Sequence, residues 1–494
     1  MNVVVSKSEI FGSVCVPPSK SVAHRLMIAA MLAGGRLGVK DGGKDMQATA
    51  QCLDIIGQAM RVEACHVCDM RTGVCGMFGA VYGVINVDEG GELPILNAGE
   101  SGSTLRFLLP IVCALGLKCV ITGEGRLKDR PLGELVNTLA ANGAVIERIE
   151  SGQLPLKTGG KLRAGKYEID GGISSQYVTG LLFALPLLDG DSEIVIRGEL
   201  VSSNYVDITL GVLADFGIAV QKTDYGYYVK GNQKYILPQD LTVEGDWSSA
   251  AFMLALGVLS GEVRVRGLKC DSLQGDKVIV DLLKLAGADI SVSYDESADN
   301  NVLSVKAESG NEYNNRCFGE VVARKSELHA IDFDAKHCPD IVPIMAAVLS
   351  FANGKSHISS VDRLRDKESD RLSAVRTLLS HFGIRTEYTN DVLTIFGGRH
   401  TPSVNNGVHM SADSEECVQS VNEEYAPSVH KEERAHTACH THGFLDHRMA
   451  MSAIVMALNT NGTSRVDGVE CISKSYPTFV EHAVALGAKI VTEN

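Results

Sequence analysis

Apolar residues recur along this chain in helix-length stretches, and each stretch opens on a short polar cluster. After the cluster nearly every position is apolar, so the pattern predicts a helix buried on all sides. Ser and Asp are favoured caps at such helix starts, where free amide N–H groups also attract anions. The six clusters begin at Ser19-Lys20-Ser21, Ser101-Gly102-Ser103, Ser174-Ser175-Gln176, Asp246-Trp247-Ser248, Cys338-Pro339-Asp340 and Asp446-His447-Arg448.

A second set of six helices, amphipathic in pattern, alternates with the first. Each is expected to end near a glycine, and in most copies β-branched, strand-like residues follow. These glycines are Gly57, Gly143, Gly217, Gly287, Gly383 and Gly487. The unit repeats every roughly 70 to 110 residues, which is too long for a solenoid, so each unit is expected to be a small α/β module. Six modules predict two domains of three.

The length and composition agree with this division. A chain of 494 residues exceeds what one core usually supports, and 45% of the residues are hydrophobic. The apolar runs are too short to cross a bilayer, and residues 1–7 lack the basic region and long apolar core of a signal peptide. Thirteen cysteines, an odd number without a small-domain framework, are typical of a reducing compartment. We therefore expect a cytoplasmic protein.

The net charge of −14 argues against a nucleic-acid partner. The basic residues are gathered instead at or near helix starts, which indicates a small, highly anionic substrate. These basic clusters are Lys20 with Arg25, residues 126–131, residues 363–371, Asp446-His447-Arg448 and Lys474.

Taken in order, these motifs resemble the family of 3-phosphoshikimate 1-carboxyvinyltransferases, the EPSP synthases, along almost the whole chain. The segments that carry the resemblance are Pro18-Ser19-Lys20-Ser21 with Arg25, residues 102–106, Gly123-Glu124 through residues 128–131, Ser174-Ser175-Gln176, Val201-Ser202 with residues 205–209, Glu244-Gly245-Asp246, Pro339-Asp340, residues 367–372, residues 446–451, and Lys474 before Pro477.

The resemblance implies a pair of inside-out α/β domains, each of three βαβαββ repeats with buried helices, hinged around a central cleft. The chain would cross between the domains near Ser19 and near Leu241. One domain is then residues 20–240, and the other joins residues 1–19 to residues 241–494. Crossings so close to Lys20 and Asp246 favour hinge closure over the substrate. We expect a monomer.

The implied reaction transfers the enolpyruvyl group of phosphoenolpyruvate (PEP) to the 5-hydroxyl of shikimate 3-phosphate. It proceeds by addition and elimination through a tetrahedral ketal, releases phosphate, and serves chorismate and aromatic amino acid biosynthesis. No cofactor and no metal are expected. Such chemistry needs an acid and a base on opposite sides, together with fixed cations for a phosphate and a carboxylate.

The resemblance also implies the site residues. Asp340 is expected to be the base for the attacking hydroxyl, Glu368 to serve the PEP methylene, and Lys20 to be a candidate proton donor. Residues expected to hold shikimate 3-phosphate are Lys20, Ser21, Arg25, Ser174, Ser175, Gln176, Ser202, Tyr205, Asp340, Arg363 and Lys367. Those expected around PEP are Lys20, Gly102, Arg130, Gln176, Arg371, Arg448 and Lys474.

Plainer interpretations stay open for several of these residues. Asp340 is also expected to cap its helix, because Asp is a favoured N-cap. Glu368 is equally compatible with an ion pair to Lys367 or Arg371. His447 is interpreted either as a site residue or as a side chain that only orients the phosphate.

Two positions depart from the family pattern. Glu100 places a carboxylate where relatives have asparagine, which would oppose an anionic ligand unless the side chain points away. PEP affinity and glyphosate response are therefore in question. Arg363 also stands where asparagine is common. A rival register through residues 97–99 would shift the following helix by three residues.

Residues 398–443 form a polar, histidine-rich insertion within the second domain. Its composition predicts a solvated loop, with a metal site as the weaker alternative, because no matched pair of ligand spacings is present. Cys65-His66-Val67-Cys68 is a lone pair of cysteines and equally weak evidence for a metal.

Three other functions fit the sequence less well. UDP-N-acetylglucosamine enolpyruvyltransferase shares the fold and donor but typically has Lys-Asn where this chain has Lys20-Ser21, and a loop cysteine that residues 123–131 lack. An RNA 3′-phosphate cyclase would need a nucleotide site and a nucleophilic histidine, and the sequence indicates neither; the net charge of −14 also disfavours an RNA substrate. A non-catalytic scaffold would not need Lys20, Asp340 and Glu368.

Overall fold

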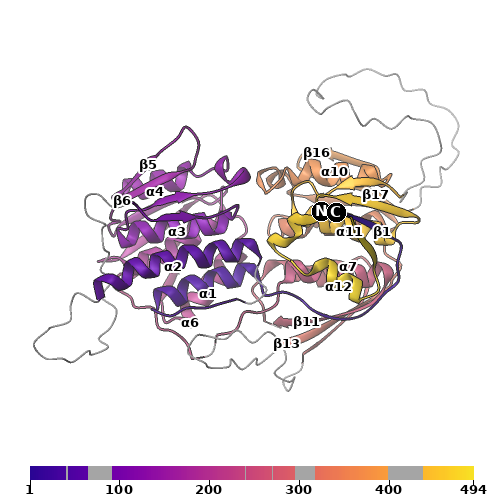
Figure 1. Cartoon of the computed structure of the whole chain (residues 1–494), viewed down its shortest axis with the longest axis horizontal. Helices are drawn as coiled ribbons and strands as arrows, with labels where there is room; N and C mark the ends of the chain where they lie inside the picture. Colours follow the sequence, from indigo (N-terminus) through magenta and orange to yellow (C-terminus); the bar gives the residue numbers. More distant parts are fainter. Residues whose placement is uncertain are drawn as a thin grey trace, which may run out of the picture.

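The computed structural model describes residues 1–39, 43–64, 92–239, 241–269, 271–294, 318–398 and 438–493. Figure 1 shows two lobes side by side, with both chain termini on the same lobe. Each lobe has its own hydrophobic core. One core draws its residues from positions 22–243, and the other joins residues 3–16 to residues 247–488. We call these the N-lobe and the C-lobe.

The six predicted buried helices are all present, and nearly all of their residues are buried. Side chains at five of the six polar starts cap the helix that follows: Ser19, Ser101, Ser174, Asp246 and Asp446 each accept a backbone N–H. The helices are α1 (Lys20–Leu32), α3 (Gly102–Leu115), α5 (Ser175–Ala184), α7 (Trp247–Ser260), α9 (Val342–Ser350) and α11 (His447–Asn459).

The expectation that Asp340 caps its helix is wrong. Residues Pro339–Ile341 form a short 3-10 helix, η4, ahead of α9, and the residue at its N-cap is Cys338. No side-chain capping bond is made there. The Asp340 carboxylate is instead engaged by cationic side chains across the site.

Five of the six outer helices end next to the predicted glycine, which has a positive φ in each case. Gly57 is the exception: α2 continues through it to Ala64, so the predicted end is wrong. An interior glycine costs a helix about 1 kcal/mol, a penalty that packing readily outweighs. The outer helices are α2 (Lys44–Ala64), α4 (Gly133–Ala141), α6 (Asn204–Asp215), α8 (Ile279–Leu285), α10 (Arg371–His381) and α12 (Phe479–Ala485).

The described strands form five four-stranded sheets. The two N-lobe sheets hold β3 (Ile95–Asn97), β4 (Val120–Thr122), β6 (Leu156–Gly160) and β5 (Ala144–Arg148), then β7 (Lys166–Asp170), β8 (Ser192–Arg197), β10 (Gly226–Val229) and β9 (Val220–Thr223). The C-lobe sheets hold β12 (Asp289–Tyr294), β13 (Phe318–Arg324), β11 (Gly261–Lys269) and β2 (Ile10–Cys15), then β14 (Asp332–Asp334), β15 (Gly354–Ser359), β17 (Val392–Gly397) and β16 (Thr386–Thr389), and finally β18 (His440–His442), β19 (Thr463–Asp467), β1 (Asn2–Ser6) and β20 (Lys489–Glu493).

Each sheet repeats one topology. In the second N-lobe sheet, β7 and β8 are parallel and flank the buried helix α5 in the chain, and after the outer helix α6 the chain returns as the antiparallel pair β9 and β10. This is the predicted βαβαββ unit, confirmed for five of the six modules. In the first module α1 and α2 are described, whereas residues 65–91, including the cysteine pair, lie outside the described residues.

The insertion boundary at residue 443 is too late, because His440–His442 form strand β18, parallel to β19. Residues 399–437 lie outside the described residues. Among the described helices, none is both long and apolar enough to cross a membrane.

Two crossing segments join the lobes, and they lie side by side. Pro18 forms an antiparallel bridge with Gly245. Ser19 N donates to Glu244 O at 2.7 Å, and Asp246 N donates to Pro17 O at 2.9 Å. The ends of the N-lobe are thus tied together directly beside the helix starts of α1 and α7.

Candidate active site

A cavity of about 490 Å³ is lined by residues of both lobes. Fifteen of the seventeen predicted site residues line it: Lys20, Ser21, Arg25, Gly102, Arg130, Ser174, Ser175, Gln176, Ser202, Tyr205, Asp340, Arg363, Lys367, Glu368 and Arg448. Its wall carries seven Lys or Arg side chains against four carboxylates, so the cavity is suited to an anionic ligand.

The start of α1 brings Lys20, Ser21 and Arg25 to the cavity. Lys20 Nζ pairs with Asp45 at 2.9 Å. Burial acts to lower the pKa of Lys20, but Asp45 outweighs it and the pKa is raised, so the amine is charged. Arg25 is buried and donates to the carbonyl oxygens of Ser21 at 2.6 Å and Tyr205 at 2.8 Å. Most of its hydrogen bonds therefore hold the N-lobe together.

Gln176, at the start of α5, is held from both ends of its amide. Its Oε1 accepts from Arg106 Nη1 at 2.6 Å, and its Nε2 donates to Ser103 Oγ at 3.0 Å. Arg106 also donates to Pro131 O at 3.2 Å. Arg106 and Ser103 line the cavity but were not predicted as site residues. The signal was available, since both lie in the motif of residues 102–106.

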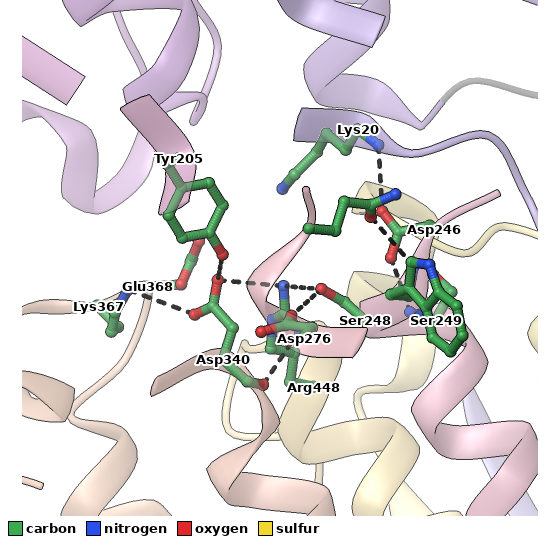
Figure 2. Close-up of polar contacts among 12 residues, drawn as sticks. Lys20, Tyr205, Asp246, Ser248, Ser249, Asp276, Asp340, Lys367, Glu368 and Arg448 are labelled. Atoms are coloured by element: carbon green, nitrogen blue, oxygen red, sulfur yellow. Dashed lines mark hydrogen bonds and ion pairs between the residues drawn. The ribbon is translucent and has the colours of Figure 1, made fainter. Parts of the chain in front are cut away.

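Asp340 lies where groups from both lobes converge (Figure 2). Tyr205 OH donates to its Oδ2 at 3.1 Å, and Lys367 Nζ lies 3.3 Å from its Oδ1. Arg448 reaches Oδ2 at 3.3 Å. Burial would raise the pKa of Asp340, but Arg448, Lys367 and Arg371 hold it well below the usual range. The carboxylate is therefore ionised and can accept a proton.

Arg371 bridges three carboxylates behind the cavity wall. It is 1% exposed, and it donates to Asp446 at 2.7 Å, Asp340 at 2.7 Å and Glu368 at 2.6 Å. The ion pair considered for Glu368 is therefore present, with Arg371 as the partner. Burial would raise the pKa of Glu368, but Arg371, helped by Arg130 and Lys20, keeps it well below the usual range. Arg371 itself does not line the cavity.

Several cationic donors in the wall are buried and have no hydrogen-bond partner within the described part of the chain. These are the Nε atoms of Arg106, Arg130 and Arg448. Gly102 lets two of these side chains approach the start of α3, because a Cβ there would lie 2.7 Å from Arg130 Nη1 and 3.0 Å from Arg106 Nη1. Free guanidinium donors beside a helix start suit a phosphate or carboxylate.

Lys474, the second predicted residue outside the cavity wall, forms an ion pair with Glu100. Lys474 ends the 3-10 helix η6 (Val469–Lys474) of the C-lobe, and Glu100 precedes α3 of the N-lobe. The unusual carboxylate is thus neutralised by a residue expected to bind PEP.

His447 is 1% exposed, and neither ring nitrogen has a partner among the described residues. Burial lowers its pKa to about 3, with Lys20 and Arg448 adding to the effect, so the imidazole is neutral. It lies just behind the wall that Arg448 forms.

No group of three or more His, Cys, Asp or Glu side chains within the described ranges is arranged to hold a metal ion. Hydroxyls, an amide, cations and carboxylates, of which Asp340 and Glu368 are ionised, meet at this cavity. Together with the paired α/β lobes, these features suit an enzyme that binds anionic ligands and transfers protons.

Comparison with known proteins identifies the family. The family model for EPSP synthase (3-phosphoshikimate 1-carboxyvinyltransferase) matches residues 4–483, so the chain belongs to this family. It is similar to the 3-phosphoshikimate 1-carboxyvinyltransferase of Clostridium kluyveri, with 34% identity over 99% of this chain and 98% of that protein. The corresponding protein of Clostridioides difficile is 33% identical over 98% of this chain and 97% of that one.

Solved structures share the fold. An EPSP synthase from Acinetobacter baumannii superposes with a TM-score of 0.69 at 21% identity, covering 99% of this chain and all (100%) of that one. The enolpyruvyl transferase NikO from Streptomyces tendae has a TM-score of 0.63 at 16% identity, covering 99% and 98% of the two chains. The predicted two-domain α/β fold is confirmed.

Proposed function

We propose that this protein transfers the enolpyruvyl group of PEP to the 5-hydroxyl of shikimate 3-phosphate, giving 5-enolpyruvylshikimate 3-phosphate and phosphate. Family membership over nearly the whole chain supports the reaction. The observation that carries the assignment to this cavity is the meeting of Asp340 with Tyr205 from the opposite lobe at 3.1 Å, amid a surplus of cations.

In the proposed mechanism Asp340 takes the proton of the attacking hydroxyl. Its ionised state supports this role, and Tyr205, whose pKa is raised well above the usual value by burial and by Asp340, remains a hydrogen-bond donor. A base within hydrogen-bond reach of the substrate hydroxyl contributes about 10²–10⁴ to the rate.

Glu368 and Lys20 are proposed to serve the PEP methylene. Of the two groups Lys20 is the protonated one, so it is suited to donate the first proton, whereas the ionised Glu368 is suited to remove one from the ketal methyl group. Arg371 holds Glu368 and Asp340 in one ion-pair network at 2.6 and 2.7 Å. It is thus proposed to position both carboxylates.

The two substrates are assigned to different sets of lining residues that share Gln176. Shikimate 3-phosphate is proposed to bind Ser21, Ser174, Ser175, Gln176, Ser202, Tyr205, Arg25, Arg363 and Lys367, whose hydroxyl and amide groups suit a phosphorylated diol. PEP is proposed to bind Lys20, Gly102, Arg130, Gln176 and Arg448, where guanidinium donors are free. Lys474 would join PEP only by leaving Glu100.

We also propose the domain limits of residues 20–240 and of residues 1–19 with 241–494, a monomeric state, and a cytoplasmic location. Core membership changes from one cluster to the other between Val16 and Val22 and between Val243 and Trp247, next to the bridge of Pro18 with Gly245, which supports these limits.

A phosphate-release assay with PEP tests the function. Release is expected with shikimate 3-phosphate and only weakly with shikimate, because the 3-phosphate carries charge-assisted contacts. Release with UDP-N-acetylglucosamine in place of shikimate 3-phosphate would support the sister enzyme instead. No release with any of these acceptors would support a non-catalytic role.

A further inference from the structure

Residues 274–276 form the first turn of the 3-10 helix η3 (Gly275–Val278), with Gln274 at its N-cap, and the reaction proposed above does not use this turn. Gln274 Oε1 accepts from Ser19 Oγ at 2.8 Å and from Trp247 N at 3.1 Å, and Gln274 Nε2 donates to Gly245 O at 2.9 Å. The turn is therefore anchored to both segments that join the lobes.

From this turn, the Asp276 carboxylate lies beside Ser248 and Arg448 (Figure 2). It is 3% exposed and accepts a short hydrogen bond from Ser248 Oγ. Ser248 Oγ in turn accepts from Arg448 Nη2 at 3.3 Å, and Asp276 Oδ2 lies 3.9 Å from Arg448 Nη1. A hydroxyl that donates to a carboxylate and accepts from a guanidinium fixes the orientation of both.

The same guanidinium contacts Asp340 on its other side. Arg448 Nη1 donates to Asp340 O at 3.1 Å, and Nη2 donates to Asp340 Oδ2 at 3.3 Å. Arg448 Nε has no partner among the described residues, so its terminal nitrogens alone set the side-chain orientation. One guanidinium is thus held between two carboxylates, one lining the cavity and one behind it.

We propose that Asp276 is a positioning residue for the transfer reaction, acting through Ser248 to hold Arg448 against Asp340. The inference rests on the proposed function. Asp276 does not line the cavity, so it acts on the reaction only through Arg448 and through its own charge.

Its charge also affects Asp340. A negative Asp276 disfavours the negative form of Asp340 and makes it a stronger base. Burial and then Asp340 raise the pKa of Asp276, against the lowering effect of Arg448, to about 6. Protonation of Asp276 below that pH should weaken the base. The charged or titratable groups facing Asp276 are Arg448 from α11, Asp340 from η4, Asp246 before α7, Tyr205 from α6, and Cys338.

The test is Asp276→Asn, which keeps the size of the side chain and removes its charge. We expect kcat/KM for PEP to fall about ten- to a hundredfold, the scale of one contact to a charged group. The affinity for shikimate 3-phosphate by calorimetry should not change. The inflection near pH 6 in the kcat profile should disappear. The matched control is Asp271→Asn, an exposed acid of the preceding loop, which should behave as wild type.

Ser248→Ala separates the positioning of Arg448 from the effect of the Asp276 charge on Asp340. It removes the hydroxyl that joins Asp276 to Arg448 and leaves the Asp276 charge in place. It should raise KM for PEP and retain the inflection. Wild-type kcat/KM for PEP in both variants would overturn the inference, and so would parallel losses of melting temperature and shikimate 3-phosphate affinity, which indicate a general structural role. A wild-type enzyme inactive with both substrates would overturn the proposed function itself.

Discussion

The two lobes build the cavity wall from different chemistry. The N-lobe side presents most of the hydroxyls, one amide and four of the seven cations, and its contacts are made within the lobe: Arg25 to Ser21 and Tyr205, Lys20 to Asp45, and Arg106 to Gln176. The C-lobe side presents carboxylates and cations that pair with each other, centred on Arg371. Both sides thus supply cations, but three of the four carboxylates in the wall, Asp340, Asp366 and Glu368, come from the C-lobe.

This difference separates binding from chemistry. A hydroxyl wall offers donors and acceptors without fixing protonation, whereas the buried ion-pair network keeps Asp340 and Glu368 ionised despite their burial. Variants of Asp340 and Glu368 should therefore affect turnover first, and variants of the cations assigned to shikimate 3-phosphate should affect affinity or stability first.

The largest effect is expected from Asp340→Asn and Glu368→Gln. Each keeps its shape and loses its proton-transfer function, so turnover should fall by about 10²–10⁴ while shikimate 3-phosphate affinity changes much less. Steady-state kinetics and calorimetry measure the two quantities. Exchange of PEP methylene protons with deuterated solvent separates the roles, and Glu368→Gln should suppress it.

Glu387→Gln, an exposed acid on strand β16, is the control and should behave as wild type. Methylene exchange at the wild-type rate in Glu368→Gln would move that role to Lys20 and leave Glu368 as an ion-pair partner of Arg371.

A smaller effect is expected from removing one cation from each side. Lys367→Ala should weaken shikimate 3-phosphate binding by about 1.5–3 kcal/mol without lowering the melting temperature. Arg25→Ala should weaken binding and also destabilise the N-lobe, since it frees the carbonyl oxygens of Ser21 and Tyr205. Calorimetry and thermal melting distinguish the two. Lys336→Ala removes an exposed interlobe pair with Glu199 and serves as the control. Unchanged affinity in both cavity variants would contradict the assigned phosphate contacts.

Each lobe also buries one histidine, and these predict an acid instability. Burial lowers the pKa of His24 and of His447 to about 3. Between the model-peptide value of 6.5 and about 3 the unfolded chain therefore binds a proton that the folded chain does not. Stability should fall as pH falls through this window, by up to about 1.4 kcal/mol per pH unit for each group.

His24→Asn and His447→Asn remove one such group each, so each variant should lose less stability than wild type on acidification. The measurement is the free energy of unfolding by denaturant at about pH 7 and at about pH 5. The difference between these two values in each variant, compared with wild type, gives the contribution of the histidine that was replaced. An equal pH dependence in both variants and wild type would mean that these imidazoles titrate normally.

The smallest effect is expected from Glu100→Gln. It releases Lys474 for PEP, so KM for PEP should fall by less than about fivefold, since a partly exposed pair contributes about 0.2–1 kcal/mol. Steady-state kinetics measure it, with Glu124→Gln, an exposed neighbour bonded to Asn97, as the control. A rise in KM would show that Glu100 supports the site rather than competing with PEP.

The fold was largely predictable because caps and periodicity are local. Polar starts such as Ser101 and Asp446 act on backbone groups within three residues, so sequence alone indicates them. Gly57 was mistaken for a helix end because interior glycine depends on packing. Asp340 was mistaken for a cap because ion pairs with Arg371 and Arg448, distant in sequence, determine its orientation.

Sequence motifs predicted the residues that line the cavity. They did not predict the ion pairs that residues of the site form with one another. Lys474 and Arg371 match the family pattern, yet their partners place them behind or beside the cavity wall. Asp45 and Asp276 could not be predicted from the sequence, and the structure identifies them by their ion pairs with Lys20 and Arg448. Partners that are distant in the chain produce no recognisable spacing between residues.

The position of strand β1 has a consequence for how the chain acquires its structure during synthesis. Residues 2–6, made first, pair with β19 and β20, whose residues 463–493 are made last. The N-lobe core of residues 22–243 has all its partners much earlier. During translation the N-lobe can therefore fold while strand β1 is still unpaired. The C-lobe can complete its sheet of β1, β19 and β20 only when the chain is nearly finished.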